Sequence, residues 1–188
     1  VRVLKAEPKA VRLVVLAQGT VTPRTETALV PEVSGNIIWI SENLVAGGYF
    51  KAGEPLLRID DRDYMAAVER AIATINRTEA EQQFSAFELQ RFQELESSEL
   101  ISRSDVESGM RAARVAEANL QDARVALEQA ERNLERTEIL APFKGLVRNE
   151  QADVGQFVSR GAAIANIYAI DYVEVRLPIA DQQLAYLD

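Results

Sequence analysis

The chain has 188 residues, a formal net charge of −8 and an apolar fraction of 47%, which is enough for one ordinary domain or two small ones with a folded core. The acidic balance argues against nucleic-acid binding through phosphates, because such binding needs a basic face. The sequence has no Cys and no His. This removes disulfides, thiol nucleophiles, His-based acid/base pairs and most zinc sites, so we expect no catalytic residue, metal site or cofactor.

The N-terminal third is rich in β-branched residues and turns. Residues 1–27 contain β-type runs, and residues 29–60 form a second β region with Gly-rich turns. Within it, residues 37–40 (Ile-Ile-Trp-Ile) predict a buried strand with Trp39 packed inside the fold. Residues 55–59 predict the strand that closes this unit.

Residues 61–138 predict two long antiparallel helices with a turn near residues 97–102, because proline is absent and a heptad pattern persists. Arms of about 36 residues would be about 54 Å long. The second arm has a column of larger residues and a column of smaller ones: Val106, Ala113, Leu120, Leu127, Leu134, and Gly109, Ala116, Ala123, Ala130, Thr137. The corresponding columns of the first arm are Val68, Ile75, Gln82, Leu89, and Tyr64, Ala71, Thr78, Ser85, Phe92.

Two details of this hairpin stay open. The second arm can be capped by Ser102 with Asp105 or by Ser104 with Glu107. The charged outer faces are either solvated or packed against neighbouring hairpins.

An acidic cluster, Asp60, Asp61 and Asp63, precedes the first arm. It lacks the spacing of an EF-hand calcium loop. A helix N-terminus attracts acidic side chains through its dipole, so we interpret the cluster as helix capping.

The chain after the hairpin returns to β character. Residues 139–170 are punctuated by Pro and Gly, and residues 172–178 alternate apolar and polar side chains as a half-buried strand does. Residues 180–187 predict a short helix. Since no apolar run approaches the roughly 18–20 residues that span a bilayer, and no signal peptide is present, we expect a piece of a longer protein whose targeting segment is missing.

The two β segments that flank the hairpin repeat each other. Residues 33–37 (Val-Ser-Gly-Asn-Ile) parallel residues 143–147 (Phe-Lys-Gly-Leu-Val). The spacing of glycines also recurs, from Gly47 to Gly53 and from Gly155 to Gly161. Neither half-motif can bury its apolar face alone, so together they predict one small β-sandwich into which the hairpin is inserted.

This arrangement resembles the periplasmic adaptors, or membrane fusion proteins, of resistance-nodulation-division (RND) efflux pumps in Gram-negative bacteria. The residues that carry the resemblance are 33–37, 53–60, Asp63-Tyr64, 141–147, 154–158 and 173–175. The resemblance implies an α+β fold with a long antiparallel α-helical hairpin inserted between the two halves of a lipoyl-like β-sandwich. Partial β-barrel and membrane-proximal strands would lie at both termini.

The resemblance also implies domain boundaries. The expected units are N-terminal strands of the membrane-proximal and β-barrel domains (1–28), lipoyl half 1 (29–60), the α-helical hairpin (61–138), lipoyl half 2 (139–170) and the start of the β-barrel domain (171–188).

The function implied is that of a non-enzymatic adaptor that links an inner-membrane RND transporter to an outer-membrane channel of the TolC type, for the export of small molecules and multidrug resistance. Several copies would associate into a ring in the periplasm, anchored to the inner membrane through a missing N-terminal anchor. Three alternatives stay open: an adaptor of a type I or ABC exporter, a biotinyl or lipoyl carrier domain, and a coiled-coil scaffold. The carrier lacks a suitable lysine, since Lys51 lies in a Gly-rich turn and Lys144 near a strand start.

One family motif transfers residue by residue. Adaptor tips carry an Arg, a Leu four positions later and a Ser or Thr seven further on, and Arg91, Leu95 and Ser102 match. These are the candidate partner-binding residues for the outer-membrane channel. Arg91 and Leu95 share a helix face, and a guanidinium can donate several hydrogen bonds to channel carbonyls or carboxylates. From spacing alone, the alternative is a solvated Arg, a hairpin-core Leu and an ordinary N-cap.

Overall fold

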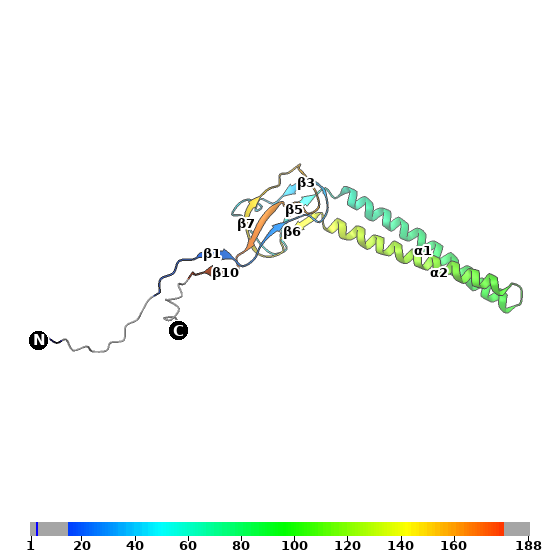
Figure 1. The fold of residues 1–188 in the computed structure, drawn as a ribbon. Coiled ribbons are helices and arrows are strands. Elements are labelled where there is room, and N and C mark those ends of the chain that lie inside the picture. Colours follow the sequence, from blue (N-terminus) through cyan, green and yellow to red (C-terminus); the bar gives the residue numbers. More distant parts are fainter. Residues whose placement is uncertain (1–2, 4–14, 179–188) are drawn as a thin grey trace.

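The computed structural model describes residue 3 and residues 15–178, so the expected strands within residues 4–14 and the expected helix at 180–187 lie outside it. Figure 1 shows a β-sandwich from one end of which a long helical hairpin projects. At the other end, β1 (Thr20–Pro23) pairs with β10 (Val173–Arg176) as a two-stranded antiparallel ribbon. This architecture confirms the predicted fold class.

The sandwich consists of two four-stranded antiparallel sheets. The first has the order β2-β9-β7-β4, with bounds Glu26–Leu29, Ala165–Ala169, Gly145–Glu150 and Tyr49–Phe50. The second has the order β6-β5-β3-β8, with bounds Glu138–Leu140, Pro55–Ile59, Gly35–Ile40 and Phe157–Val158. Strand β2 begins at Glu26, within the stretch predicted to precede the sandwich. The domain boundaries implied by the resemblance stay predictions.

The sequence repeat relates the two sheets. In the repeat, β2, β3, β4 and β5 correspond to β6, β7, β8 and β9. Exchanging each strand of the first sheet for its equivalent gives the strand order of the second sheet. Hydrogen bonds repeat as well, since the N–H of Gly47 donates to Val147 O and the N–H of Gly155 donates to Ile37 O, both at 2.8 Å. Each sheet contains strands from both halves, so neither half can complete a sheet alone.

The core lies between the two sheets, with side chains no more than 8% exposed. It is made by residues of both halves: Leu29, Val33, Ile37, Leu44, Phe50, Leu56, Leu57, Ile59, Ile139, Ala141, Val147, Ala152, Val158, Ile164, Ala165 and Ile167. Burial alternates along β9, as expected where alternate side chains face the same side of a sheet, whereas Leu56 and Leu57 of β5 are both fully buried at a register shift between Pro55 and Leu57.

The prediction that Trp39 packs inside the fold is wrong. A register shift between Ile37 and Trp39, where β3 pairs with β5, interrupts the alternation. A bulge of this kind re-aims the side chains that follow it, and Ile38 and Trp39 are 51% and 38% exposed. The Trp39 ring instead lies 5.2 Å from the guanidinium of Arg58 on the outer face.

The hairpin consists of α1 (Arg62–Ser97, 36 residues) and α2 (Arg103–Glu135, 33 residues). Every residue of the predicted heptad columns is buried or half-buried, which confirms the pattern. The helices approach closely at Gly109, where an added Cβ would lie 2.7 Å from Cδ2 of Phe92.

The acidic cluster accepts hydrogen bonds at the start of α1, but through Asp60 and not through Asp61. Asp61 occupies the N-cap position without a side-chain hydrogen bond. The Asp60 carboxylate instead accepts hydrogen bonds from the backbone N–H of Arg62 at 3.2 Å and from its Nε at 2.9 Å. These bonds, the side-chain bond foremost, lower the pKa of Asp60 to about 2.

We predict that Arg62→Gln moves the pKa of Asp60 upward toward the ordinary value of 3.8, as measured by NMR titration of its side-chain carboxyl carbon. A depressed folded-state pKa means that the Asp60 contribution to stability is complete above the unfolded pKa and is lost as pH falls toward 2. An unchanged titration in the variant would contradict the assigned cause.

We also predict that Gly53→Ala destabilises the sandwich by about 1–2 kcal/mol, measured by urea unfolding. Gly53 has a φ of 75°, and nothing lies within 4 Å of an added Cβ, so the cost arises from the left-handed backbone alone. Gly53→Asn is the matched control and should cost less, because Asn tolerates this conformation. Equal losses would point to a steric cause.

Candidate functional site

The tip of the hairpin is a turn with a defined backbone geometry. The N–H of Leu100 donates to Leu95 O at 3.0 Å, and the N–H of Glu99 donates to Glu96 O at 2.9 Å. This is the Schellman pattern that ends helices. Glu99 takes the left-handed position with φ 57° and is alone among the described non-Gly residues in having a positive φ. The turn leaves the Leu100 side chain 70% exposed.

Ser102 caps the second helix, which settles the choice between the two predicted caps. Its Oγ accepts the N–H of Asp105 at 3.3 Å, while the Asp105 carboxylate accepts the N–H of Ser102 at 3.0 Å. The Ser102 hydroxyl also donates to that carboxylate at 2.7 Å. The hydroxyl and then the N–H of Ser102 lower the pKa of Asp105. The Ser102 side chain is therefore exposed but already engaged within the chain.

Arg91 lies near the end of α1 with about half of its side chain exposed. Its guanidinium contacts the Glu88 carboxylate at 3.0 Å and lies 5.5 Å from the centroid of the Phe92 ring. Exposed ion pairs of this kind contribute only about 0–1 kcal/mol. The guanidinium can therefore exchange Glu88 for a carboxylate or carbonyl of a partner at little cost.

Leu95 lies one helical turn beyond Arg91 and is half-buried. The structure thus places Arg91 and Leu95 in the last two turns of α1, and Ser102 directly before α2. Leu100 was missed by the family spacing, although the apolar pair Leu100-Ile101 within the otherwise polar stretch 97–104 was a signal that could have indicated it.

The outer faces of the hairpin are not uniformly polar. Phe84 and Phe87 on α1 are 62% and 64% exposed, and Val115 on α2 is 55% exposed. Phe84 and Val115 line a shallow groove of about 490 Å³ between the arms. Apolar surface of this kind is typical of contact regions.

In residue 3 and residues 15–178, no group of three or more acidic, His or Cys side chains could hold a metal ion. None of the helices within that part of the chain is long and apolar enough to cross a membrane.

Comparisons with known proteins agree with this geometry. A family profile described as "RND MFP, barrel-sandwich hybrid domain" matches residues 26–170. Among curated proteins, the chain is 27% identical over 186 residues to "Multidrug resistance protein MdtA" of Photorhabdus laumondii, covering 98% of this chain and 46% of the relative. It is 28% identical over 149 residues to "Multidrug efflux pump subunit AcrA" of Escherichia coli K12, covering 77% and 37%. The chain thus spans less than half the length of these relatives.

Solved structures show the same fold. The membrane fusion protein Spr0693 of Streptococcus pneumoniae R6 superposes with a TM-score of 0.64 at 21% identity, covering 92% of this chain and 71% of that one. A MacA-MexA chimera with the Pseudomonas aeruginosa MexA α-hairpin domain gives 0.62 at 23% identity, covering 90% and 56%. Since the profile covers more than half of the sequence and the fold agrees with it, this chain belongs to the RND membrane fusion proteins, a family of periplasmic adaptors.

Proposed function

We propose that the chain is the hairpin and sandwich of a non-enzymatic adaptor that links an inner-membrane RND transporter to a TolC-like outer-membrane channel for the export of small molecules. One observation carries this proposal: a helical hairpin with arms of 36 and 33 residues is rooted in a small sandwich and projects from it, so that its tip lies at the far end (Figure 1). Such an element supplies reach, at about 1.5 Å per residue. The matched relatives, whose names refer to multidrug resistance and to a multidrug efflux pump, support the same function.

The tip offers two kinds of contact to the channel. Arg91 offers a guanidinium held only by a weak surface pair, and Leu100 with the half-buried Leu95 offers apolar surface. Ser102 keeps the turn in shape by capping α2. The proposed division of roles is therefore polar recognition by Arg91, apolar contact by the two leucines and positioning by Ser102.

Self-association into a ring in the periplasm is the second part of the proposal. The exposed Phe84 and Phe87 support lateral packing of hairpins, because aromatic side chains bury large areas at interfaces.

At the end of the sandwich away from the hairpin, the β1–β10 ribbon exposes Val21, Val173 and Val175. Two-stranded ribbons are marginally stable by themselves, which supports the assignment of these strands to a β-barrel domain near the inner membrane.

We predict that Arg91→Asp and Leu95→Ser each weaken binding of the full-length adaptor to the channel by at least about tenfold. Arg is enriched among the interface residues that cost about 2 kcal/mol or more when truncated, and burial of a Leu side chain contributes about 1.5–3 kcal/mol. The measurement is surface plasmon resonance with the purified channel, together with dye efflux from cells.

The matched control is Arg124→Asp, which makes the same charge change at an exposed position of α2 away from the tip. Normal channel binding and efflux in the two tip variants would overturn the tip assignment. The same assay with an RND transporter and an ABC exporter subunit offered separately distinguishes the RND adaptor from the exporter alternative.

A further prediction concerns Leu100. Leu100→Ser should weaken channel binding by about tenfold, the effect expected for losing the burial of one apolar side chain. The unfolding midpoint should stay unchanged, because the side chain is 70% exposed in the free chain. Leu100→Met keeps the apolar contact and should bind normally, so equal binding by the Ser and Met variants would remove Leu100 from the interface.

A further inference from the structure

The hairpin joins the sandwich at two neighbouring points. Strand β5 leads through Asp60 and Asp61 into α1, and α2 leads through Arg136 into β6. The two points are adjacent because β5 pairs with β6, where Arg58 lies opposite Glu138. Two adjacent connections define an axis about which a rigid hairpin can swing. A contact away from that axis is needed to set the direction of the hairpin.

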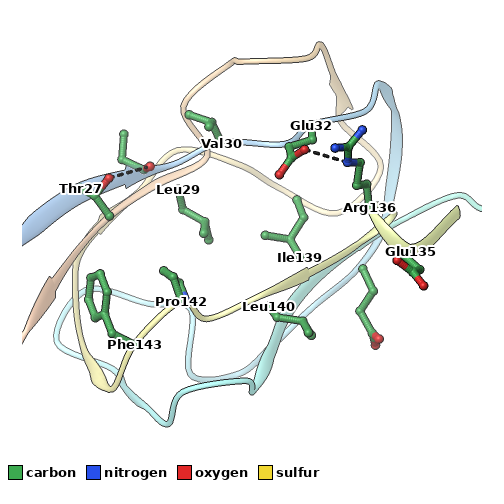
Figure 2. Close-up of a pocket in the computed structure, with 12 residues that line it drawn as sticks. Thr27, Leu29, Val30, Glu32, Glu135, Arg136, Ile139, Leu140, Pro142 and Phe143 are labelled. Atoms are coloured by element: carbon green, nitrogen blue, oxygen red, sulfur yellow. Dashed lines mark hydrogen bonds and ion pairs between the residues drawn. The ribbon is translucent and has the colours of Figure 1, made fainter. Parts of the chain in front are cut away.

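One loop, residues 30–34, supplies contacts to both arms, and we refer to it as the brace loop. The Tyr64 hydroxyl of α1 donates a hydrogen bond to the backbone oxygen of Ser34 at 2.7 Å. Nε of Arg136, the residue that caps α2, lies 2.7 Å from the Glu32 carboxylate. Figure 2 shows this pair at one end of the cleft between β2 and β6.

The brace loop is itself held by the second half of the sandwich. The buried Pro31 accepts a hydrogen bond at its oxygen from the N–H of Gly161 at 2.8 Å. The Ser34 hydroxyl accepts the N–H of Arg160 at 3.0 Å. Val33 between them is 7% exposed. The loop is thus anchored by its own backbone and core contacts and can serve as a fixed support.

The internal repeat shows that this support is one-sided. The repeat equivalents of Glu32 and Ser34 are Pro142 and Lys144, in the loop between β6 and β7. That loop precedes Gly145, which pairs with Ala169 at the end of the sandwich near β10, whereas the brace loop precedes β3, whose Ile37 pairs with Ile59 at the hairpin end. Only the first copy of the loop therefore lies beside the hairpin, where it supplies the ion pair.

Small changes at the root have large effects at the tip. The 33 residues of α2 make a lever of about 50 Å, so a tilt of about 10° displaces the tip by about 9 Å. A groove of about 430 Å³ lies at the same root, lined by Ile38, Met65 and Leu134 among others, and no residue of the brace loop lines it.

We infer that Glu32, Tyr64 and Arg136 are positioning residues that hold the hairpin in one direction relative to the sandwich and thereby present the tip. This role of the three residues does not depend on what the tip binds. Its consequence for channel docking rests on the proposed function.

The test is an interspin distance measured by double electron–electron resonance. The chain has no cysteine, so Gln83→Cys on α1 and Glu150→Cys on β7 give two unique label sites, both exposed. Glu32→Arg combined with Tyr64→Phe should broaden the distance distribution. Exchanging the pair, with Glu32→Arg and Arg136→Glu in a chain that keeps Tyr64, should restore the narrow distribution of the parent.

The matched control is Glu26→Arg, which makes the same charge change and breaks the Glu26–Arg148 pair on the outer face of the other sheet. It should leave the distance distribution unchanged. The Glu32 side chain is 59% exposed, so thermal unfolding should confirm that all variants fold. A parent-like distribution in Glu32→Arg/Tyr64→Phe, or one that broadens equally in Glu26→Arg, would overturn the inference.

Channel binding provides the second readout. If the fraction of correctly directed hairpins falls to about a tenth, the apparent Kd for the channel rises about tenfold, and the exchanged pair should recover it. Altered distances with no channel binding by the parent chain would reject the proposed function and leave the brace in place. Unaltered distances would reject the brace and leave the proposed function in place.

Discussion

The pairing of β5 with β6 is the constraint on which this structure depends. It joins residues on either side of the hairpin, for example through the N–H of Ile59, which donates to Thr137 O at 2.8 Å. Closing a loop of this length costs conformational entropy. The hairpin reduces that cost because its own heptad packing brings its two ends together. The sandwich in turn supplies the apolar core that neither half of the repeat can make alone. The hairpin therefore favours closure of the sandwich, and the sandwich holds the two ends of the hairpin together.

Periodic features of this fold could be predicted from the sequence, and local irregularities could not. The heptad columns and the glycine repeat extend over many residues, so each position supports the assignment of the next. Trp39 shows the limit of prediction from sequence. Its outward orientation follows from a bulge, in which one extra residue of β3 interrupts the pairing with β5. The bonding of Asp60 rather than Asp61 to Arg62 likewise depends on backbone angles that residue type does not specify.

The candidate site follows the same division. Family spacing could indicate Arg91, Leu95 and Ser102, but not that Ser102 is committed to Asp105 or that Arg91 is held by Glu88. Those states depend on rotamers and on the cap geometry. The exposure of Leu100 depends on Glu99 adopting a left-handed backbone, which is uncommon for a residue other than Gly.

The proposed function requires many weak contacts and a stiff connection between them. A tip with one exchangeable guanidinium and a small apolar surface binds weakly by itself. Linking several such tips in a ring raises the overall affinity without any new contact, provided that all tips can engage at once. That condition is geometric, since an arm of about 54 Å converts a small error of direction at its root into a large displacement at its tip. A contact of little value for folding, such as Glu32 with Arg136, can thus control assembly.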